Sequence, residues 1–528
     1  MNNIKILDCT LRDGGYVNNW EFGGRTIKKI ISKLVQANID IIECGFLTDK
    51  GGNEDKSLFN DVAKIKYYIE PKSNNTMYVA MIAYPNNIID NIPICDGTSI
   101  DGIRVTFHEN EIDDALSICE DLIDKGYKVF IQPIGITSYS DISLINLIEK
   151  VNEINPYAFY IVDTLGQMYK NDLLRIFYLI DNNLNKEINI GFHSHNNLQL
   201  SFSNAQELMM LHTKRTIILD TSVFGMGRGA GNLCTELVAQ YINDNIEKKY
   251  KIEYLLEIID EHLNSIHSKY PWGYSAPYCL AAINNCHPNY ASYLMEKNTI
   301  TAKEISNILR NMHDEKRTIY DKNYIEEVYM EYQKHYIDDR EDLEKIKNYI
   351  GNRKVLIIAP GKSIDLEGKK IKEFINEYNP FIISVNFIPA NIECDCIFIS
   401  NFKRFEGLSD ILDLTKTKST VILTSNITVK KEVRYSVVNY TDLLVDNAII
   451  SDNAGLMLIN LLNRLSINQI FMAGFDGYSI NEANYSENDM ELVKTKENIE
   501  GLNVAIKKQI KNINRNLDIK FITNSKYN

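Results

Sequence analysis

The sequence predicts an α/β protein: a (β/α)8 barrel, then a helical extension, then a Rossmann-like α/β domain. Two observations predict the barrel. Eight short β-branched or aromatic runs recur in the first half of the chain, and segments of helical periodicity separate them. Apolar strands that alternate with amphipathic helices form parallel sheets covered by helices. Eight such units in about 230 residues match a closed TIM barrel better than an open doubly wound sheet. A second alternating pattern after residue 350 predicts the separate domain.

The eight predicted strands share a high content of Ile, Val, Phe and Tyr. They are "IKILDCT" (4–10), "IDIIECGF" (39–46), "MYVAMIAY" (77–84), "DGIRVTF" (101–107), "YKVFIQPIG" (127–135), "AFYIVDT" (158–164), "INIGFHSH" (188–195) and "TIILDTSVFG" (216–225). Helical periodicity is clearest in "GRTIKKIISKLVQAN" and "NDLLRIFYLIDNNL". These elements place the barrel domain at residues 1–250.

Residues 251–350 keep helical periodicity without a strand signal, which predicts a helical extension. Residues 351–528 return to alternation and predict a mostly parallel sheet in a domain of its own. Its strands are expected at 354–359, 380–386, 395–400, 419–424, 468–473 and 518–523.

Composition narrows the class of protein. The net charge of −13 argues against nucleic acid as the main partner, because a phosphate backbone selects basic surfaces. No apolar run approaches the ~20 residues that span a bilayer, and the N-terminus has no secretory pattern. Nine scattered cysteines without C-x-x-C spacing indicate reduced thiols and a cytoplasmic protein.

In a (β/α)8 barrel the chemistry lies at the carboxyl ends of the strands. The polar residues expected there are Asp8, Arg12, Asp13, Glu43, Arg104, His108, Gln132, Asp163, Thr164, His193, His195, Asn196 and Asp220, followed by the glycine-rich loop "GMGRGAGN". Glu43 and Arg104 have an alternative interpretation as a buried ion pair that stabilises the barrel. Asp163 and Asp220 could equally orient loops, and the glycine-rich loop could be a tight turn without a ligand.

The strongest signal is the pair His193 and His195. Residues i and i+2 of a strand point to the same face, so both imidazoles can hold one ion. Asp13 adds a carboxylate, which completes a two-histidine, one-carboxylate set with positions left open for substrate. The sequence therefore predicts a divalent-metal site.

Three motifs in order, "DCTLRDGG", "GFHSHNN" and "GMGRGAGN", resemble the metal-dependent pyruvate aldolases of the 4-hydroxy-2-oxovalerate aldolase type. Their wider group includes hydroxymethylglutaryl-CoA lyase, isopropylmalate synthase and the carboxyltransferase domain of pyruvate carboxylase. The resemblance covers about residues 1–290. It implies a carbon–carbon lyase acting through a metal-bound, pyruvate-type enolate, with Mn²⁺ or Mg²⁺ expected ahead of Zn²⁺ or Co²⁺. It also implies a 2-oxo acid and an aldehyde as substrates, and a homodimer.

The resemblance also implies roles for individual residues. Arg12 would face the enolate oxygen, and Asn232 would lie at or beside the metal held by Asp13, His193 and His195. Thr164 falls where these aldolases have a substrate-binding Ser, and Tyr278 in "WGYSAPY" falls where they have an active-site Tyr. Asn196 is expected to support the metal ligands, and Arg104 and Gln132 to lie on the substrate side.

One position departs from the family. The aldolases carry a His base three residues after the metal-binding Asp, and here that catalytic position is Tyr16. A phenol with a pKa near 10 is a poor base at neutral pH. Either the base is His108, Glu43 or Tyr278, or the aldehyde or acyl partner differs. The alternatives are a Claisen-type synthase that condenses an acyl-CoA, and a barrel without catalysis that carries a C-terminal nucleotide-sugar-binding or glycosyltransferase-like function.

The C-terminal region does not contain a P-loop, because the motif needs Gly where Leu356 stands. The stretches "LIIAPGKSIDLEG", "FIISVNF" and "NAGLMLINLLNRLSINQIFMAGFDGYS" resemble bacterial sialyltransferases that use CMP-activated sugars, and a related pterin-pyrophosphokinase-like family. The resemblance implies a nucleotide or nucleotide-sugar site. Its candidate residues are Gly361, Ser363, Asn386 and Asp476. The chain has no His after His335, so a binding module without catalysis is the alternative.

Overall fold

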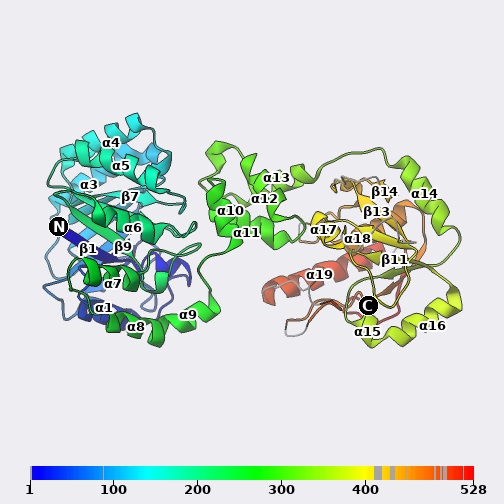
Figure 1. Cartoon of the computed structure of the whole chain (residues 1–528). Helices are drawn as coiled ribbons and strands as arrows, with labels where there is room; N and C mark the ends of the chain where they lie inside the picture. The colour runs from blue at the N-terminus through cyan, green and yellow to red at the C-terminus, as the bar shows by residue number, and fades with distance from the viewer. Residues whose placement is uncertain are drawn as a thin grey trace. The chain divides into compact units, whose positions relative to one another are not determined.

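The computed structural model describes residues 3–86, 88–409, 419–427, 435–447, 449–480, 483–487, 490, 496–514 and 517–528. The chain divides into two compact units (Figure 1). The first is Met1–Ser292 with Leu309–Tyr320, and the second is Tyr293–Ile308 with Asp321–Asn528.

The first unit is the predicted (β/α)8 barrel. Its parallel strands follow the order β1-β9-β8-β7-β6-β5-β4-β2, and pairing of β1 with β2 closes the ring. The strands are β1 (Asn3–Asp8), β2 (Ile41–Leu47), β4 (Met77–Ala83), β5 (Gly102–Phe107), β6 (Lys128–Pro133), β7 (Ala158–Asp163), β8 (Asn189–Ser194) and β9 (Thr216–Thr221). A two-residue strand, β3 (Leu58–Phe59), adds to β2 outside the ring. All eight expected strands are confirmed.

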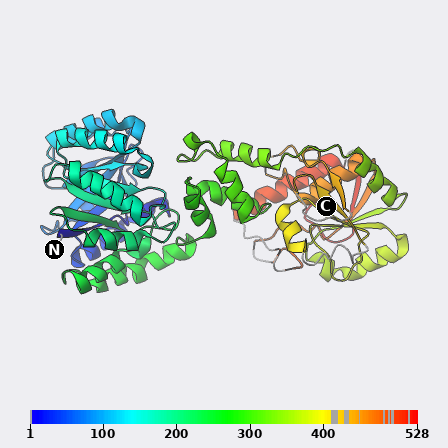
Figure 2. The ribbon, with the colours of Figure 1, turned by 45° about the horizontal axis from the view of Figure 1, so that its top comes forward.

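Helices surround this ring in both views (Figures 1 and 2). They are α1 (Gly24–Gln36), α2 (Val62–Ile69), α3 (Ile112–Asp124), α4 (Asp141–Ile154), α5 (Lys170–Asn183), α6 (Ser201–Met210) and α7 (Thr235–Asn245). In α1 the buried residues are Ile27, Ile30, Ile31 and Leu34, a spacing that places them on one helix face. This face covers the outside of the sheet.

The strands are buried on both faces, which explains why they read as apolar runs rather than alternating ones. All seven residues of β2 are buried. Side chains such as Leu7, Val79, Phe130 and Ile218 form a separate cluster within the ring. The barrel is therefore packed below its upper rim, and its chemistry is confined to the strand ends.

Residues 251–350, all of which the structure describes, contain helices joined by loops and no strand. The helices are α8 (Ile252–Ile258), α9 (Asn264–Lys269), α10 (Ala276–Ile283), α11 (Pro288–Lys297), α12 (Ala302–Arg310), α13 (Lys322–Gln333) and α14 (Arg340–Ile350). This stretch contributes residues to both compact units. No helix within the described residues has both the length and the apolar character needed to cross a bilayer.

The second unit contains a seven-stranded parallel sheet in the order β14-β13-β12-β11-β10-β15-β16. Its strands are β10 (Val355–Ile358), β11 (Phe381–Val385), β12 (Cys396–Ile399), β13 (Thr420–Thr424), β14 (Tyr435–Val438), β15 (Gln469–Ala473) and β16 (Asp518–Phe521), and its helices are α15 (Ser363–Leu366), α16 (Gly368–Tyr378), α17 (Phe402–Ser409), α18 (Ala454–Arg464) and α19 (Lys496–Ile513). Strand β14 was not predicted, because a four-residue edge strand is too short to give a periodic signal.

Candidate metal centre and active site

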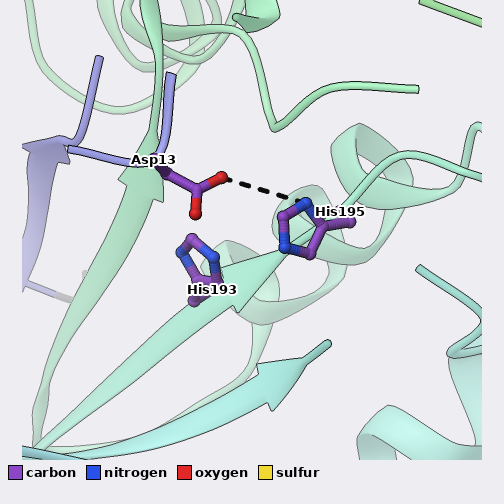
Figure 3. Close-up of side chains that lie close together, drawn as sticks. All are labelled: Asp13, His193 and His195. Atoms are coloured by element: carbon purple, nitrogen blue, oxygen red, sulfur yellow. Dashed lines mark ion pairs between the residues drawn. The ribbon is translucent and has the colours of Figure 1, made fainter. Parts of the chain in front are cut away.

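Asp13, His193 and His195 meet at the carboxyl end of the barrel (Figure 3). Asp13 lies in the turn after β1, His193 in β8, and His195 directly after β8. One donor atom from each residue lies within 4.8 Å of the other two, and Asp13 Oδ2 is 4.0 Å from His195 Nδ1. All three side chains are buried. The triad predicted from the H-x-H spacing therefore converges in space.

The protonation states of these groups fit a divalent cation. Burial alone raises the pKa of the Asp13 carboxyl, but Arg12 and the two histidines outweigh it and hold that pKa well below its usual range. Burial lowers the pKa of His195 to about 3, so its imidazole is neutral at pH 7. Its Nδ1 has no hydrogen-bond partner although it is buried. An ionised carboxylate and a neutral imidazole whose buried nitrogen is left unpaired are groups that a metal-ligand set requires.

His193 is fixed by a partner that supports such a role. Its Nδ1 lies 3.0 Å from Oδ2 of Asp220, at the end of β9. A carboxylate on one ring nitrogen fixes the ring orientation and leaves the other nitrogen for a metal. Asp220 thus positions His193.

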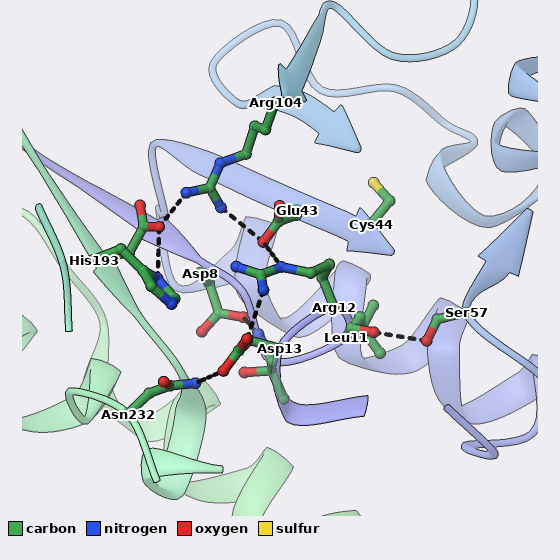
Figure 4. Close-up of polar contacts among 12 residues, drawn as sticks. Asp8, Leu11, Arg12, Asp13, Glu43, Cys44, Ser57, Arg104, His193 and Asn232 are labelled. Carbon is green, nitrogen blue, oxygen red and sulfur yellow. Dashed lines mark hydrogen bonds and ion pairs between the residues drawn. The ribbon is translucent and has the colours of Figure 1, made fainter. Parts of the chain in front are cut away.

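A chain of buried charges continues from this site (Figure 4). Nε of Arg12 donates to Glu43 at 2.8 Å, and Nη1 donates to Asp13 at 2.5 Å. The remaining Nη2 is buried without a partner. Because two of its three nitrogens are fixed by carboxylates, the guanidinium is rigid and presents one free donor beside the triad.

Arg104 joins the two ends of this series of buried charges. Its Nη1 is 2.7 Å from Oε2 of Glu43, and its Nη2 pairs with Asp220. Arg104 is fully buried, and burial is outweighed by the two carboxylates, which raise its pKa. The ion pair considered for Glu43 and Arg104 is present, and it connects the arginine beside the metal site to the carboxylate behind His193.

A cavity of about 820 Å³ opens above these groups. The predicted site residues that line it are Arg12, Asp13, Tyr16, His108, Gln132, Thr164, His193, His195 and Tyr278. Four others do not line it: Glu43 and Arg104 lie beneath it in the charge chain, and Asn232 and Asn196 form contacts of their own. Asn232 donates to Asp13 Oδ2 at 2.7 Å. The Asn196 side-chain oxygen accepts a hydrogen bond from the Ser201 hydroxyl at the start of α6.

Several polar atoms remain available toward the cavity. Gln132 is 1% exposed, and its Nε2 has no partner. Outside the cavity lining, the side-chain oxygen of Asn232 beside Asp13 is likewise buried and unpaired. Thr164 accepts a hydrogen bond from the backbone of Gly135 at 3.0 Å. The cavity thus combines cationic, amide and hydroxyl groups around one centre.

Two further side chains of the cavity were not singled out from the sequence. The Arg228 guanidinium, in the glycine-rich loop, lies 4.2 Å from the centre of the Tyr16 ring. His287 lines the cavity, and burial lowers its pKa to about 4. Neither contact leaves a periodic or motif signal, because each joins residues far apart in the chain.

The second unit holds a cavity of about 290 Å³. Gly361, Asn386 and Asp476 line it, whereas Ser363 lies behind it and donates its backbone N–H to Asp476 at 2.8 Å. Gly361 follows β10 and Asp476 follows β15, neighbouring strands from which the chain winds in opposite directions. Open parallel sheets bind ligands in the crevice at this kind of switch point.

Residues 3–260 match the family model described as HMGL-like. This match spans the barrel. A 4-hydroxy-2-oxovalerate aldolase of Pseudoalteromonas translucida (strain TAC 125) is 26% identical over 240 residues, covering 44% of this chain and 68% of that protein. An oxaloacetate decarboxylase of Mycobacterium tuberculosis (strain ATCC 25618 / H37Rv) is 26% identical over 229 residues, covering 43% and 66%. A 4-hydroxy-2-oxovalerate aldolase of Marinomonas sp. (strain MWYL1) is 24% identical over 250 residues, covering 46% and 72%.

The family match ends at residue 260, so the HMGL-like relationship concerns the barrel. The matched stretches cover about two thirds of each of these relatives. The motifs singled out from the sequence lie inside the matched range, and the C-terminal sheet lies outside it.

Proposed function

We propose that the HMGL-like barrel is a divalent-metal-dependent carbon–carbon lyase that makes or breaks an aldol bond beside the keto group of a 2-oxo acid, with pyruvate as that acid. The observation that carries the proposal is the buried Asp13–His193–His195 triad with the unpaired Nη2 of Arg12 beside it. Relatives named as aldolases and as an oxaloacetate decarboxylase support the same class of reaction.

A divalent ion, when bound by the triad, supplies Lewis acidity where negative charge develops on the oxygen of the oxo acid. Arg12 supplies a fixed hydrogen-bond donor to the same oxygen. A donor already rigid in the ground state costs no reorganisation as charge appears, and Glu43 and Asp13 provide this rigidity. Thr164 and the free Nε2 of Gln132 are suited to bind the carboxylate of the acid.

The proton-transfer group is chosen from the three candidates. Glu43 accepts a hydrogen bond from Arg12, forms an ion pair with Arg104 and does not line the cavity, so it is held away from substrate. His108 and Tyr278 both line the cavity. We favour His108, because histidine is the side chain that most often serves as a general acid or base.

Hydrogen–deuterium exchange at the methyl group of pyruvate tests this proposal. The full-length protein is incubated in D2O with pyruvate and Mn²⁺ or Mg²⁺, and loss of the methyl proton signal is followed by NMR. Exchange should require both the metal and Asp13, so Asp13→Ala should abolish it. Asp113→Ala, an exposed carboxylate on α3 of the same barrel, is the matched control and should retain it.

Absence of exchange in a protein with metal demonstrably bound would contradict pyruvate as the substrate. Release of free thiol from acetyl-CoA with a 2-oxo acid would then support the acyl-CoA condensation instead. A barrel that binds none of Mn²⁺, Mg²⁺, Co²⁺ and Zn²⁺ would contradict both enzyme proposals.

We also propose that the cavity of the second unit binds a nucleotide-type ligand. Its position at the switch point of a parallel sheet supports this. Asn386 adds support: it is 9% exposed, its backbone is left-handed at φ 58°, and its side-chain NH2 group bonds no described residue. A strained, buried amide aimed at a cavity is typical of a ligand site.

Calorimetric titration of the full chain with CMP, UDP, GDP and dTDP tests this second proposal. Saturable binding of at least one compound, weakened about tenfold or more by Asn386→Ala, is expected. Binding of none of the four would contradict it. The pyruvate exchange of the same preparation shows whether the protein is intact.

A further inference from the structure

The cavity above the metal triad does not end at Tyr16. It adjoins a second hollow of about 630 Å³, and the two share Tyr16, Phe46 and Ala83. We call this hollow the outer recess; Trp20, Thr48, Asp49 and Pro85 are among its own lining residues. Sites of roughly 300–1,000 Å³ accommodate drug-sized ligands, so the two hollows together exceed what pyruvate and a two-carbon aldehyde fill.

Tyr16 is fixed as a wall between the two hollows. Its ring centre lies 4.2 Å from the Arg228 guanidinium and 4.6 Å from the Trp20 ring. Trp20 is held in turn, because its Nε1 donates to the carbonyl of Arg12 at 2.9 Å. Gly15 makes this packing feasible, since a Cβ there would lie 2.1 Å from the Trp20 indole.

The contacts of Tyr16 are those of a packed aromatic ring. A cation over its face and an indole beside it fix the ring plane, and its hydroxyl donates no hydrogen bond to a described residue. These contacts hold the ring in place and do not involve the hydroxyl. The position that departs from the resembled aldolases is therefore better explained as a change in the shape of the substrate site.

The lining of the outer recess indicates the chemistry of its occupant. Phe46 lies 6.1 Å from Trp20 and 6.4 Å from Tyr16, so three rings form one aromatic surface. Thr48, Asp49 and Asn86 contribute polar groups around it. An aromatic surface bordered by hydrogen-bonding groups suits a hydroxylated carbon chain. Its C–H groups can pack against the rings while its hydroxyl groups form hydrogen bonds at the border.

We propose that the outer recess binds the hydroxylated chain of the aldehyde partner, a polyhydroxylated aldehyde of four or more carbons, and that Tyr16 sets this specificity as a wall residue. The inference rests on the proposed aldol reaction. In that reaction the new bond joins the methyl carbon of pyruvate to the aldehyde carbon. The proton lost from the methyl group ends on the former aldehyde oxygen, so no further reactant is needed.

The test uses the full-length, metal-loaded protein with pyruvate and compares different aldehydes as the second substrate. The value of kcat/KM for D-erythrose should exceed that for acetaldehyde by about tenfold or more, the range that added contacts in a pocket provide. Hexanal should not show this gain. Trp20→Ala should reduce the erythrose-to-acetaldehyde ratio toward one. An equal ratio in wild type, or a preference for hexanal, would overturn the proposal.

Tyr16→Phe separates a wall from a base. A wall keeps its ring, so the variant should retain more than about a third of the pyruvate exchange, whereas loss of a base costs about 10²–10⁴-fold. Tyr16→Ala should also lose the preference for erythrose. A loss of 100-fold or more in Tyr16→Phe would overturn the wall role.

A binding measurement separates failure of this inference from failure of the proposed function. Trp20 and Trp272 are the two tryptophans of the chain, so Trp272→Phe leaves Trp20 as a reporter in the recess. D-erythrose should quench its fluorescence saturably even if pyruvate exchange is absent, in which case only the lyase proposal fails. No saturable change would overturn the recess as a binding site.

Discussion

The barrel cavity and the cavity of the second unit are polar in different ways. Beneath the barrel cavity Arg12, Asp13, Glu43, Arg104 and Asp220 are all buried and joined into one chain. At the second cavity Arg404, Asp452 and Asp476 are half-buried, and each bonds a neutral partner. Buried charges are tolerated only when they are paired and hydrogen-bonded.

This difference in charge pairing indicates which kind of chemistry each cavity suits. In the barrel, further buried charged residues hold Arg12 and His193 in fixed orientations. A reaction centre requires groups that are fixed in this way. The second cavity offers amides, backbone groups and aromatic rings, and none of its described lining residues is a histidine. It suits binding without proton transfer. Substitutions should therefore have large effects in the barrel and small ones in the second unit.

The largest expected effect is on stability. Arg104→Met leaves Glu43 and Asp220 as buried carboxylates without their shared partner, which should lower the free energy of unfolding by about 3–5 kcal/mol. Urea unfolding is followed by tryptophan fluorescence, which reports on the barrel unit because both tryptophans belong to it, and by circular dichroism, which reports on both units. Arg404→Met, at the second cavity, is the matched control, and an equal loss in both variants would break the comparison.

The next effect is on the rate of pyruvate exchange. Arg12→Lys keeps the charge but loses the planar fork that bonds Glu43 and Asp13 and presents the free donor. We expect kcat to fall about 10²–10³-fold while Mn²⁺ affinity changes little. Exchange kinetics measure kcat, and metal titration measures the Mn²⁺ affinity. An unchanged kcat would show that Arg12 does not stabilise the developing charge.

A pH effect should follow from Asp8, which is buried at the end of β1 and accepts a hydrogen bond from Thr235 at 2.7 Å. Burial raises its pKa from 3.8 to about 6. A carboxyl whose pKa is raised on folding stabilises the protein fully below its unfolded value and loses that contribution as pH rises through the folded value.

Asp8→Asn should therefore become more stable relative to wild type by up to about 3 kcal/mol between pH 4 and pH 7. Urea unfolding at a series of pH values measures this difference. The exposed Asp113→Asn is the control and should follow the wild-type curve. A difference that stays flat from pH 4 to pH 7 would show that Asp8 titrates normally.

The smallest expected effect is on metal affinity. Asp220→Asn weakens the hold on Nδ1 of His193, and loss of such a partner typically costs about 10–100-fold in metal affinity. Mn²⁺ titration by calorimetry checks the value. Asp476→Asn, the carboxylate of the second cavity that accepts from Ser363, should leave Mn²⁺ affinity unchanged; equal weakening would remove the distinction between the two sites.

By itself the sequence determined most of the elements and the candidate metal-ligand set Asp13, His193 and His195. Apolar runs spaced by amphipathic helices identify all eight barrel strands, because a parallel strand buried on both faces has a local signature. His193 and His195 are two residues apart, so their shared face follows from strand geometry alone. The missed strand β14 shows the limit of this approach, since four residues at a sheet edge carry too little periodicity to be recognised.

Tertiary structure alone decided which partners these residues have. The contacts of Asp220 with His193, of Arg104 with both Glu43 and Asp220, and of Arg228 with Tyr16 join positions separated by 27 to more than 200 residues. Each of these contacts depends on how the barrel closes and on the register of its strands. Closure and register in turn depend on the tilt and stagger of all the strands together. A single sequence shows which charged residues are present. Their pairing is fixed only when closure of the barrel brings the strand ends together and removes the charges from water.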